Sequence, residues 1–186
     1  MLDHIFINLP PIETKRLVLR KLEYSDKNDI FEYAKNSNVA EYVLWEPHQS
    51  ELDTLAFLNI VYESYNKNEA APWGITLKNS NKIIGTAGFV KWNKENKTAE
   101  IGYALSQEYW KKGITSEAIN EIVRFGFNKM ELIKINAECI SKNLGSIKVL
   151  EKCNFKYGGE IKNKMEIKGK LRNMKMFSIL RKNYEE

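Results

Sequence analysis

The amino-acid sequence predicts a mixed α/β (α+β) domain built on a central, mostly antiparallel sheet. Short segments with alternating apolar residues predict strands, and longer segments with apolar residues every three or four positions predict helices. The expected order is β-α-α-β-β-β-α-β-α-β-β, which gives a sheet of about seven strands flanked by about four helices. Helices that interrupt a run of strands in this way are typical of a sheet with helices packed on its faces.

The N-terminal half is expected to hold three strands and two helices. Ser25 and Asp26 are expected to cap the first helix, and Ser50 with Asp53 resembles a capping box at the start of the second. The Asn and Ser residues of 78–81 suit a tight hairpin. The expected elements are a strand at 16–22, helices at 25–36 and 50–66, and strands at 73–77 and 82–90.

The stretch from Thr98 to Met130 carries the clearest pattern. An extended run turns through Gly113 into an amphipathic helix. The apolar residues of that helix form one continuous stripe, made of Ile119, Ile122, Val123, Gly126, Phe127 and Met130. Beyond it we expect a strand at 132–140, a helix at 143–152, and strands at 155–164 and 174–180.

The turn through Gly113 predicts a place for an anion. A strand that turns directly into a helix leaves unpaired backbone N–H groups in the first helical turn. These donors, the helix dipole and the adjacent Lys111 and Lys112 suit a phosphate or pyrophosphate. The alternative is an ordinary strand–turn–helix connection with two solvated lysines.

Composition indicates one ordinary globular domain, spanning residues 1–186 without a linker or internal repeat. The net charge of +5 fits a polyanionic cofactor, a phosphorylated ligand or nucleic acid equally well. Because the chain carries no nucleic-acid recognition motif and no one-sided lysine stripe, we expect no nucleic-acid partner.

The cysteines and the N-terminus indicate a cytoplasmic protein. Cys139 and Cys153 do not make a disulfide framework, and no metal-ligand spacing surrounds them, so we expect reduced, buried thiols and no metal. The first residues lack a basic leader and a long apolar core. No run approaches the length of a membrane span, so no membrane partner is expected.

Three blocks carry a family likeness over nearly the whole chain. They are ETKRLVLRKLEYSD near the N-terminus, AEIGYALSQEYWKKGITSEAI in the middle, and AECISKNLGSIKVLEKCNF toward the C-terminus. In this order the sequence resembles a GNAT-fold N-acetyltransferase, and more closely its RimJ/RimL-like branch of ribosomal-protein N-terminal acetyltransferases. The resemblance implies a GNAT fold and acetyl-CoA as cosubstrate.

The resemblance also implies where acetyl-CoA binds. The strand from Thr98 is expected to splay from the one near Leu132, with pantetheine in the gap and a backbone N–H there as the oxyanion donor. Trp110, Thr115 and the pair Cys153–Asn154 depart from the residues common in the family. The implied cofactor contacts are Tyr103, Ala104, Leu105, Trp110, Lys111, Lys112, Gly113, Ile114, Thr115, Ser116 and Asn143.

Three glutamates compete for the role of general base. Glu166 matches the glutamate that the ribosomal-protein branch is thought to use, and Glu138 matches the base position of a related N-terminal acetyltransferase. Glu100, on the strand from Thr98, is the third. The order of preference is Glu166, then Glu138, then Glu100, and the alternative for each is a solvated surface carboxylate.

The general acid is expected to be Ser146. Many GNAT enzymes carry a tyrosine where this chain has Leu150, which holds no transferable proton, and Ser146 matches the residue that the ribosomal-protein branch uses instead. A structural role is compatible with this one, since Asn143 can cap the helix with Ser146 in its first turn.

The resemblance therefore implies an acetyl-CoA-dependent N-acetyltransferase that acts on a primary amine, with a protein N-terminus as the leading acceptor. One alternative acceptor is a small amine, a polyamine or an aminoglycoside. An alternative of another class is a non-catalytic acyl-CoA-binding domain. The acceptor site is expected to be shaped by residues 42–68, and a monomer or a homodimer fits the sequence equally well.

Overall fold

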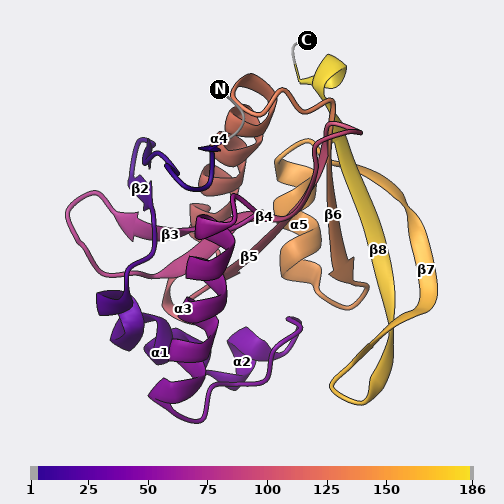
Figure 1. Cartoon of the computed structure of the whole chain (residues 1–186). Coiled ribbons are helices and arrows are strands. Elements are labelled where there is room, and N and C mark those ends of the chain that lie inside the picture. The colour runs from indigo at the N-terminus through magenta and orange to yellow at the C-terminus, as the bar shows by residue number, and fades with distance from the viewer. Residues whose placement is uncertain (1–3, 185–186) are drawn as a thin grey trace.

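The computed structural model describes residues 4–184 as helices packed on an eight-stranded sheet (Figure 1). The strand order is β1-β2-β3-β4-β5-β6-β8-β7. The strands are β1 Ile12–Glu13, β2 Leu17–Arg20, β3 Pro72–Leu77, β4 Gly85–Asn93, β5 Thr98–Leu105, β6 Lys134–Ile140, β7 Lys156–Ile167 and β8 Lys170–Leu180. The α-helices are α1 Lys27–Ala34, α2 Ser37–Ala40, α3 Glu51–Asn66, α4 Ile114–Asn128 and α5 Leu144–Lys152.

The expected fold class and order of elements are confirmed. All neighbouring strands of the described sheet are antiparallel except β5 and β6. The additions to the expected order are short elements, the two-residue strand β1 and the four-residue helix α2. Both escape detection from sequence because periodicity needs a longer window to be visible.

The last hairpin is longer than expected. The strands β7 and β8 extend to Ile167 and Lys170, and the turn between them is made by Lys168 and Gly169, with φ of 53° and 68°. Two residues with positive φ are typical of the tight turn that matches the twist of paired strands. Residues 165–167 and 170–172, which were expected outside strands, therefore continue the pairing, and Glu166 lies inside β7.

Helices cover both faces of the sheet. Trp73 of β3 packs against Phe125 of α4, with ring centroids 5.2 Å apart. Thr86 of β4 hydrogen-bonds to Tyr33 of α1. Trp73 pairs with Ala87, and neighbouring residues of a strand point to opposite faces, so α1 and α4 lie on opposite sides of the sheet. We call these sides the α1 face and the α4 face.

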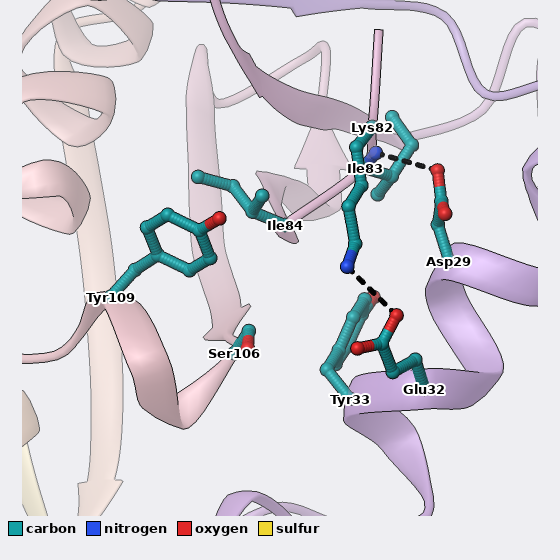
Figure 2. A pocket seen from close by; sticks show the side chains of 8 residues that line it. All are labelled: Asp29, Glu32, Tyr33, Lys82, Ile83, Ile84, Ser106 and Tyr109. Carbon is teal, nitrogen blue, oxygen red and sulfur yellow. Dashed lines mark hydrogen bonds and ion pairs between the residues drawn. The ribbon is translucent and has the colours of Figure 1, made fainter. Parts of the chain in front are cut away.

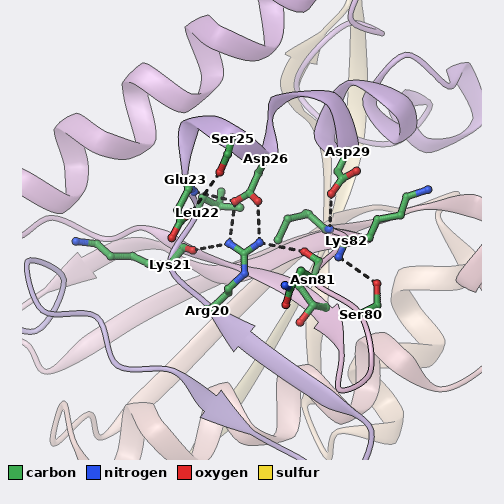
Figure 3. A network of polar contacts seen from close by, with 12 residues as sticks. Arg20, Lys21, Leu22, Glu23, Ser25, Asp26, Asp29, Ser80, Asn81 and Lys82 are labelled. Carbon is green, nitrogen blue, oxygen red and sulfur yellow. Dashed lines mark hydrogen bonds and ion pairs between the residues drawn. The ribbon is translucent and has the colours of Figure 1, made fainter.

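A charged network joins the first long strand to the helix that follows it (Figure 3). Arg20 of β2 forms two hydrogen bonds with Asp26, of 2.7 and 2.9 Å, and donates to the carbonyl groups of Lys21 and Asn81. Asp26 also accepts from the backbone N–H of Glu23 at 2.8 Å. Asp26 is the N-cap residue of α1, as expected, but its side chain makes no capping hydrogen bond to that helix. Its carboxylate binds the backbone of the preceding turn and Arg20 instead.

The capping box at α3 is confirmed, since Asp53 Oδ2 accepts from the backbone N–H of Ser50 at 2.9 Å. Both cysteines are free and buried, as expected. Among residues 4–184 no helix is both long and apolar enough to cross a membrane.

Candidate active site

The sheet opens between β5 and β6. Their parallel register runs from Thr98 opposite Lys134 to Ile101 opposite Ala137 and stops there. The strand β5 continues through residues 102–105, which stay paired with β4 on their other side. The edge of these residues that faces β6 therefore offers backbone N–H and C=O groups to an extended ligand.

A hydrogen bond attaches the loop between β5 and α4 to the end of β5. Trp110 donates its indole N–H to the carbonyl oxygen of Leu105 at 2.8 Å. The loop therefore keeps a fixed path past the end of the split, although Trp110 departs from the residues that the family resemblance leads one to expect. This contact removes the Leu105 carbonyl from the groups available to a ligand.

The first turn of α4 is arranged to receive an anion. Lys111 and Gly113 have φ of 61° and 75°, and Gly113 is the N-cap of a 15-residue helix. The first amide groups of the helix have no helical partner, and the positive end of the helix dipole points the same way. Lys111 and Lys112 are exposed there, whereas Ile114 and Ser116 are buried and offer only backbone N–H groups.

Two further cations reach this turn from distant parts of the chain. A Cβ atom placed on Gly113 would lie 3.6 Å from Arg16 Nη2 and 3.7 Å from Lys152 Nζ. Arg16 follows β1, and Lys152 ends α5. Sequence reasoning missed both residues, because nothing in their local pattern shows that they meet a turn about a hundred and about forty residues away.

Arg16 is held in place by the helix whose N-terminus it approaches. Its Nε donates to Glu117 Oε2 at 2.7 Å, and its Nη1 donates to the Lys112 carbonyl at 3.0 Å. Glu117 Oε1 also accepts from the Thr14 hydroxyl at 2.5 Å and from the Arg16 backbone at 2.9 Å. Burial opposes ionisation of Glu117, but these hydrogen bonds outweigh it and lower the pKa of the carboxyl.

A pair of hydroxyl groups faces the open part of the split. Asn143 caps α5 by accepting from the backbone N–H of Ser146 at 3.0 Å, which confirms the expected capping role. The Ser146 hydroxyl lies 2.8 Å from the phenol of Tyr103 on β5. Burial raises the pKa of Tyr103, so the phenol keeps its proton at neutral pH. Leu150 is fully buried in the core.

Comparison with known proteins agrees with this geometry. The profile of the family described as "Acetyltransferase (GNAT) domain" matches residues 16–156, which is most of the chain. The chain is 32% identical to the uncharacterized N-acetyltransferase p20 of Bacillus licheniformis, over 92% of this chain and 96% of that protein. The chain belongs to the GNAT acetyltransferase family.

GNAT enzymes of known structure share its fold. The acetyltransferase of Bacillus anthracis superposes with a TM-score of 0.83 at 29% identity, covering 93% of this chain and 99% of that one. The RimL ribosomal L7/L12 acetyltransferase in complex with coenzyme A superposes with a TM-score of 0.83 at 20% identity, covering 92% and 98%. The spermidine N(1)-acetyltransferase of Escherichia coli is 24% identical over 89% of this chain and 87% of its own.

The family assignment establishes the type of chemistry. The protein is an acyltransferase, and GNAT acetyltransferases use acetyl-CoA as cosubstrate. No group of three or more His, Cys, Asp or Glu residues in the described chain is placed to hold a metal ion. The backbone edge at 102–105 and the cationic turn at 111–116 suit the pantetheine arm and the phosphates of coenzyme A.

Two of the three candidate GNAT bases lie on the strands that form the split. Glu100 of β5 and Glu138 of β6 fall on the α1 face, opposite to the side of the sheet that holds Tyr103. Glu138 comes directly after Ala137, the last residue of β6 that pairs with β5, and it is ion-paired with Lys164 at 2.5 Å. Glu100 is ion-paired with Lys91 at 2.8 Å. Both carboxylates therefore face the same space.

The third candidate, Glu166, lies elsewhere. It is exposed near the tip of the β7–β8 hairpin, opposite Leu171 in the register. Its neighbours Met165 and Ile167 point the other way, to an apolar cluster with Ile140 that Tyr42 covers. The structure thus does not bring Glu166 together with Ser146, Glu138 or Glu100.

A cleft on the α1 face runs past the end of β5. One part, of about 10 Å³, has room for a single water between α1 and the start of β4 (Figure 2). There Lys82 is ion-paired with Glu32 at 2.8 Å, and Asp29 accepts from the backbone of Ile83 at 3.0 Å. The adjoining part, of about 290 Å³, is lined by Glu32, Tyr33, Asn36, Ser106, Gln107 and Glu108.

Proposed function

We propose that this enzyme transfers the acetyl group of acetyl-CoA to the α-amine of a protein or peptide N-terminus. The observation that carries the proposal is the split of β5 from β6, with a free backbone edge that leads to a cationic helix start. The cleft beside the end of β5 is open, and an open cleft suits the end of a polymer. RimL, which shares the fold, is named for the same kind of acceptor.

Different residues bind the different parts of acetyl-CoA in this proposal. The backbone of residues 102–105 pairs with the pantetheine arm, to which Asn143 also reaches. The amide groups of residues 111–116 hold the pyrophosphate, with Arg16 and Lys152 adding positive charge. A backbone N–H of β5 then lies close to the thioester oxygen, where negative charge develops in the transition state.

We propose Glu138 as the general base, ahead of Glu166 and Glu100. A base must lie within hydrogen-bond reach of the amine or one water away. Glu138 lies beside the split, whereas Glu166 is exposed on the outer hairpin. Lys164 holds the Glu138 carboxylate at 2.5 Å, so the ammonium of an incoming acceptor competes with Lys164 for it. Ser146 is proposed as the acid that protonates the leaving thiolate.

A second acceptor class is favoured by one observation. Glu32 and Glu108 line the open cleft, and carboxylates at that place suit a diamine or polyamine. The similarity to a spermidine acetyltransferase supports the same alternative. Because Glu32 and Glu108 are both exposed, as surface carboxylates ordinarily are, we place this acceptor second.

The experiment is an acceptor panel with release of the coenzyme A thiol as the readout. The panel contains peptides with a free N-terminus, the same peptides with a blocked N-terminus, spermidine and an aminoglycoside. We expect turnover with the free peptides and none with the blocked ones. Turnover restricted to spermidine would assign the second acceptor class. Binding of acetyl-CoA without turnover of any amine would indicate a domain that binds acyl-CoA and does not catalyse.

A further inference from the structure

The contact between Tyr103 and Ser146 joins two hydroxyl groups, either of which can donate to the other. The phenol oxygen of Tyr103 lies 2.8 Å from Ser146 Oγ and 3.4 Å from the Ser146 carbonyl oxygen. Both possible acceptors of the phenolic hydrogen thus belong to the same serine. Because a phenol is the better donor of the two hydroxyl groups, we assign its hydrogen to Ser146 Oγ, the nearer acceptor. The hydrogen of Ser146 itself must then point elsewhere.

A sulfur atom is also a neighbour of Ser146. The thiol of Cys139, on β6, lies near the Ser146 hydroxyl, which acts against the rise that burial causes in the pKa of that thiol. Ser146 therefore stands between the two strands that separate, with Tyr103 on β5 and Cys139 on β6. Tyr103 and Cys139 each lie two positions beyond the last paired residues, Ile101 and Ala137. A ligand thiol that enters the split from its open end approaches this same hydroxyl.

We propose that Tyr103 is a positioning residue for acetyl transfer: by donating to Ser146 Oγ, it turns the serine hydroxyl hydrogen toward the sulfur of the leaving coenzyme A. The proposal rests on the proposed function, in which Ser146 is the acid. It gives the side chain of Tyr103 a role in addition to the backbone contact with pantetheine.

The proton balance of the step is complete. A nitrogen–carbon bond forms, the carbon–sulfur bond breaks, and its electron pair goes to sulfur. Sulfur takes a proton from Ser146, while the proton lost by the amine passes to a carboxylate and then to water. Water returns a proton to Ser146. Tyr103 is protonated before and after the step, because burial disfavours its phenolate form.

The first test is kinetic. Tyr103→Phe keeps the ring and removes one hydrogen bond, so we expect kcat to fall about five- to tenfold with the KM for acetyl-CoA unchanged. In the Ser146→Ala background the same substitution should have no further effect. Tyr24→Phe is the matched control, because it removes another phenol hydrogen bond of 2.8 Å, to Asn59, away from the split. This control should keep the parent kcat.

The second test measures the ionisation of bound coenzyme A and needs no acceptor amine. Its result therefore does not depend on whether the proposed acceptor is correct. The thiol of bound coenzyme A is titrated by the ultraviolet absorbance of its thiolate. A hydrogen bond from Ser146 stabilises the thiolate, so Tyr103→Phe and Ser146→Ala should each move the midpoint by about half to one pH unit toward higher pH. The Tyr24→Phe control should leave it in place.

Two results would overturn the proposal. One is a thiol midpoint in Tyr103→Phe equal to that of the parent protein, whatever the kinetics. The other is a loss of kcat that is equally large with and without Ser146, which would show that Tyr103 acts independently of the serine. If no amine is acetylated but the midpoint moves as expected, the acceptor proposal fails and the role of Tyr103 stands.

Discussion

The proposed anion site depends most on Gly113. Its φ of 75° is open to glycine at little cost, and its missing side chain leaves space between Arg16 Nη2 and Lys152 Nζ. A residue with a side chain would both strain the turn and fill the place where the first helical amides point. The sequence predicts this site from Gly113, Lys111 and Lys112 because the three residues are neighbours in the chain.

Gly113→Glu is expected to abolish stabilisation by coenzyme A. The substitution places a side chain and a negative charge at the anion site, so the rise in melting temperature that coenzyme A gives the parent should vanish. For the parent, a ligand at a hundred times its Kd adds about 2.7 kcal/mol. Differential scanning fluorimetry measures both values.

Gly169→Glu is the control for backbone strain. Gly169 also has positive φ, 68°, with open space around it, but it lies in the outer hairpin. This variant should lose intrinsic stability and still respond to coenzyme A. An equal response in the Gly113 variant would contradict the assignment of the anion site.

The three glutamates are separated by their effect on kcat. Glu138→Gln should lower kcat about a hundredfold or more and flatten the acid limb of the pH–rate profile, because the base is lost. Glu166→Gln and Glu100→Gln should change kcat little, and a carboxylate that only binds the acceptor should raise KM instead. A larger loss of kcat in Glu166→Gln would restore the order of preference that the resemblance alone gives.

At the scale of elements, the sequence predicts what is local. The stripe of α4, the capping box of α3 and the order of the long strands follow from spacing within a few residues, and all are observed. The sequence does not reveal contacts between distant segments. The carboxylate of Asp26 is suited to cap a helix, but in the fold it binds Arg20. Arg16 contacts Glu117 of α4, and no local sequence pattern predicts a contact between segments so far apart.

The link between the β1–β2 turn and α4 is expected to weaken in acid. Hydrogen bonds from Thr14 and Arg16 lower the pKa of Glu117 in the folded state, although burial opposes them. The stability that Glu117 contributes is therefore present above its ordinary value of about 4.5 and is lost as pH falls through the lower folded value.

Glu117→Gln tests this link. The variant should be about 1–2 kcal/mol less stable than the parent at neutral pH, the scale of hydrogen bonds to a charged group. The difference in free energy of unfolding, measured by urea titration, should shrink as the pH is lowered below about 4. A difference that stays constant down to pH 3 would show that ionisation of Glu117 is not the cause.

At the scale of the whole molecule, the sheet has two parts, β1 to β5 and β6 to β8. Within the described chain, these parts are paired only along the short contact between β5 and β6. The edge of β5 beyond Ile101 therefore has no strand partner on the side of β6. Hydrogen exchange read by mass spectrometry should show that coenzyme A protects the amides of residues 102–105 and 111–116. The outer part of the β7–β8 hairpin should exchange at an unchanged rate. Protection confined to that hairpin would place the ligand elsewhere.

The β7–β8 hairpin also contacts the end of α2 and the segment that follows it. Lys168, in its turn, donates to the carbonyl of Ala40 and lies 4.0 Å from Glu46. Two contacts thus hold together segments that lie more than a hundred residues apart in the sequence. Recombination between relatives with a crossover in the middle of the gene would separate them. Such chimeras would keep each fold element and lose the match between the two, whereas chimeras that exchange both segments together would preserve it.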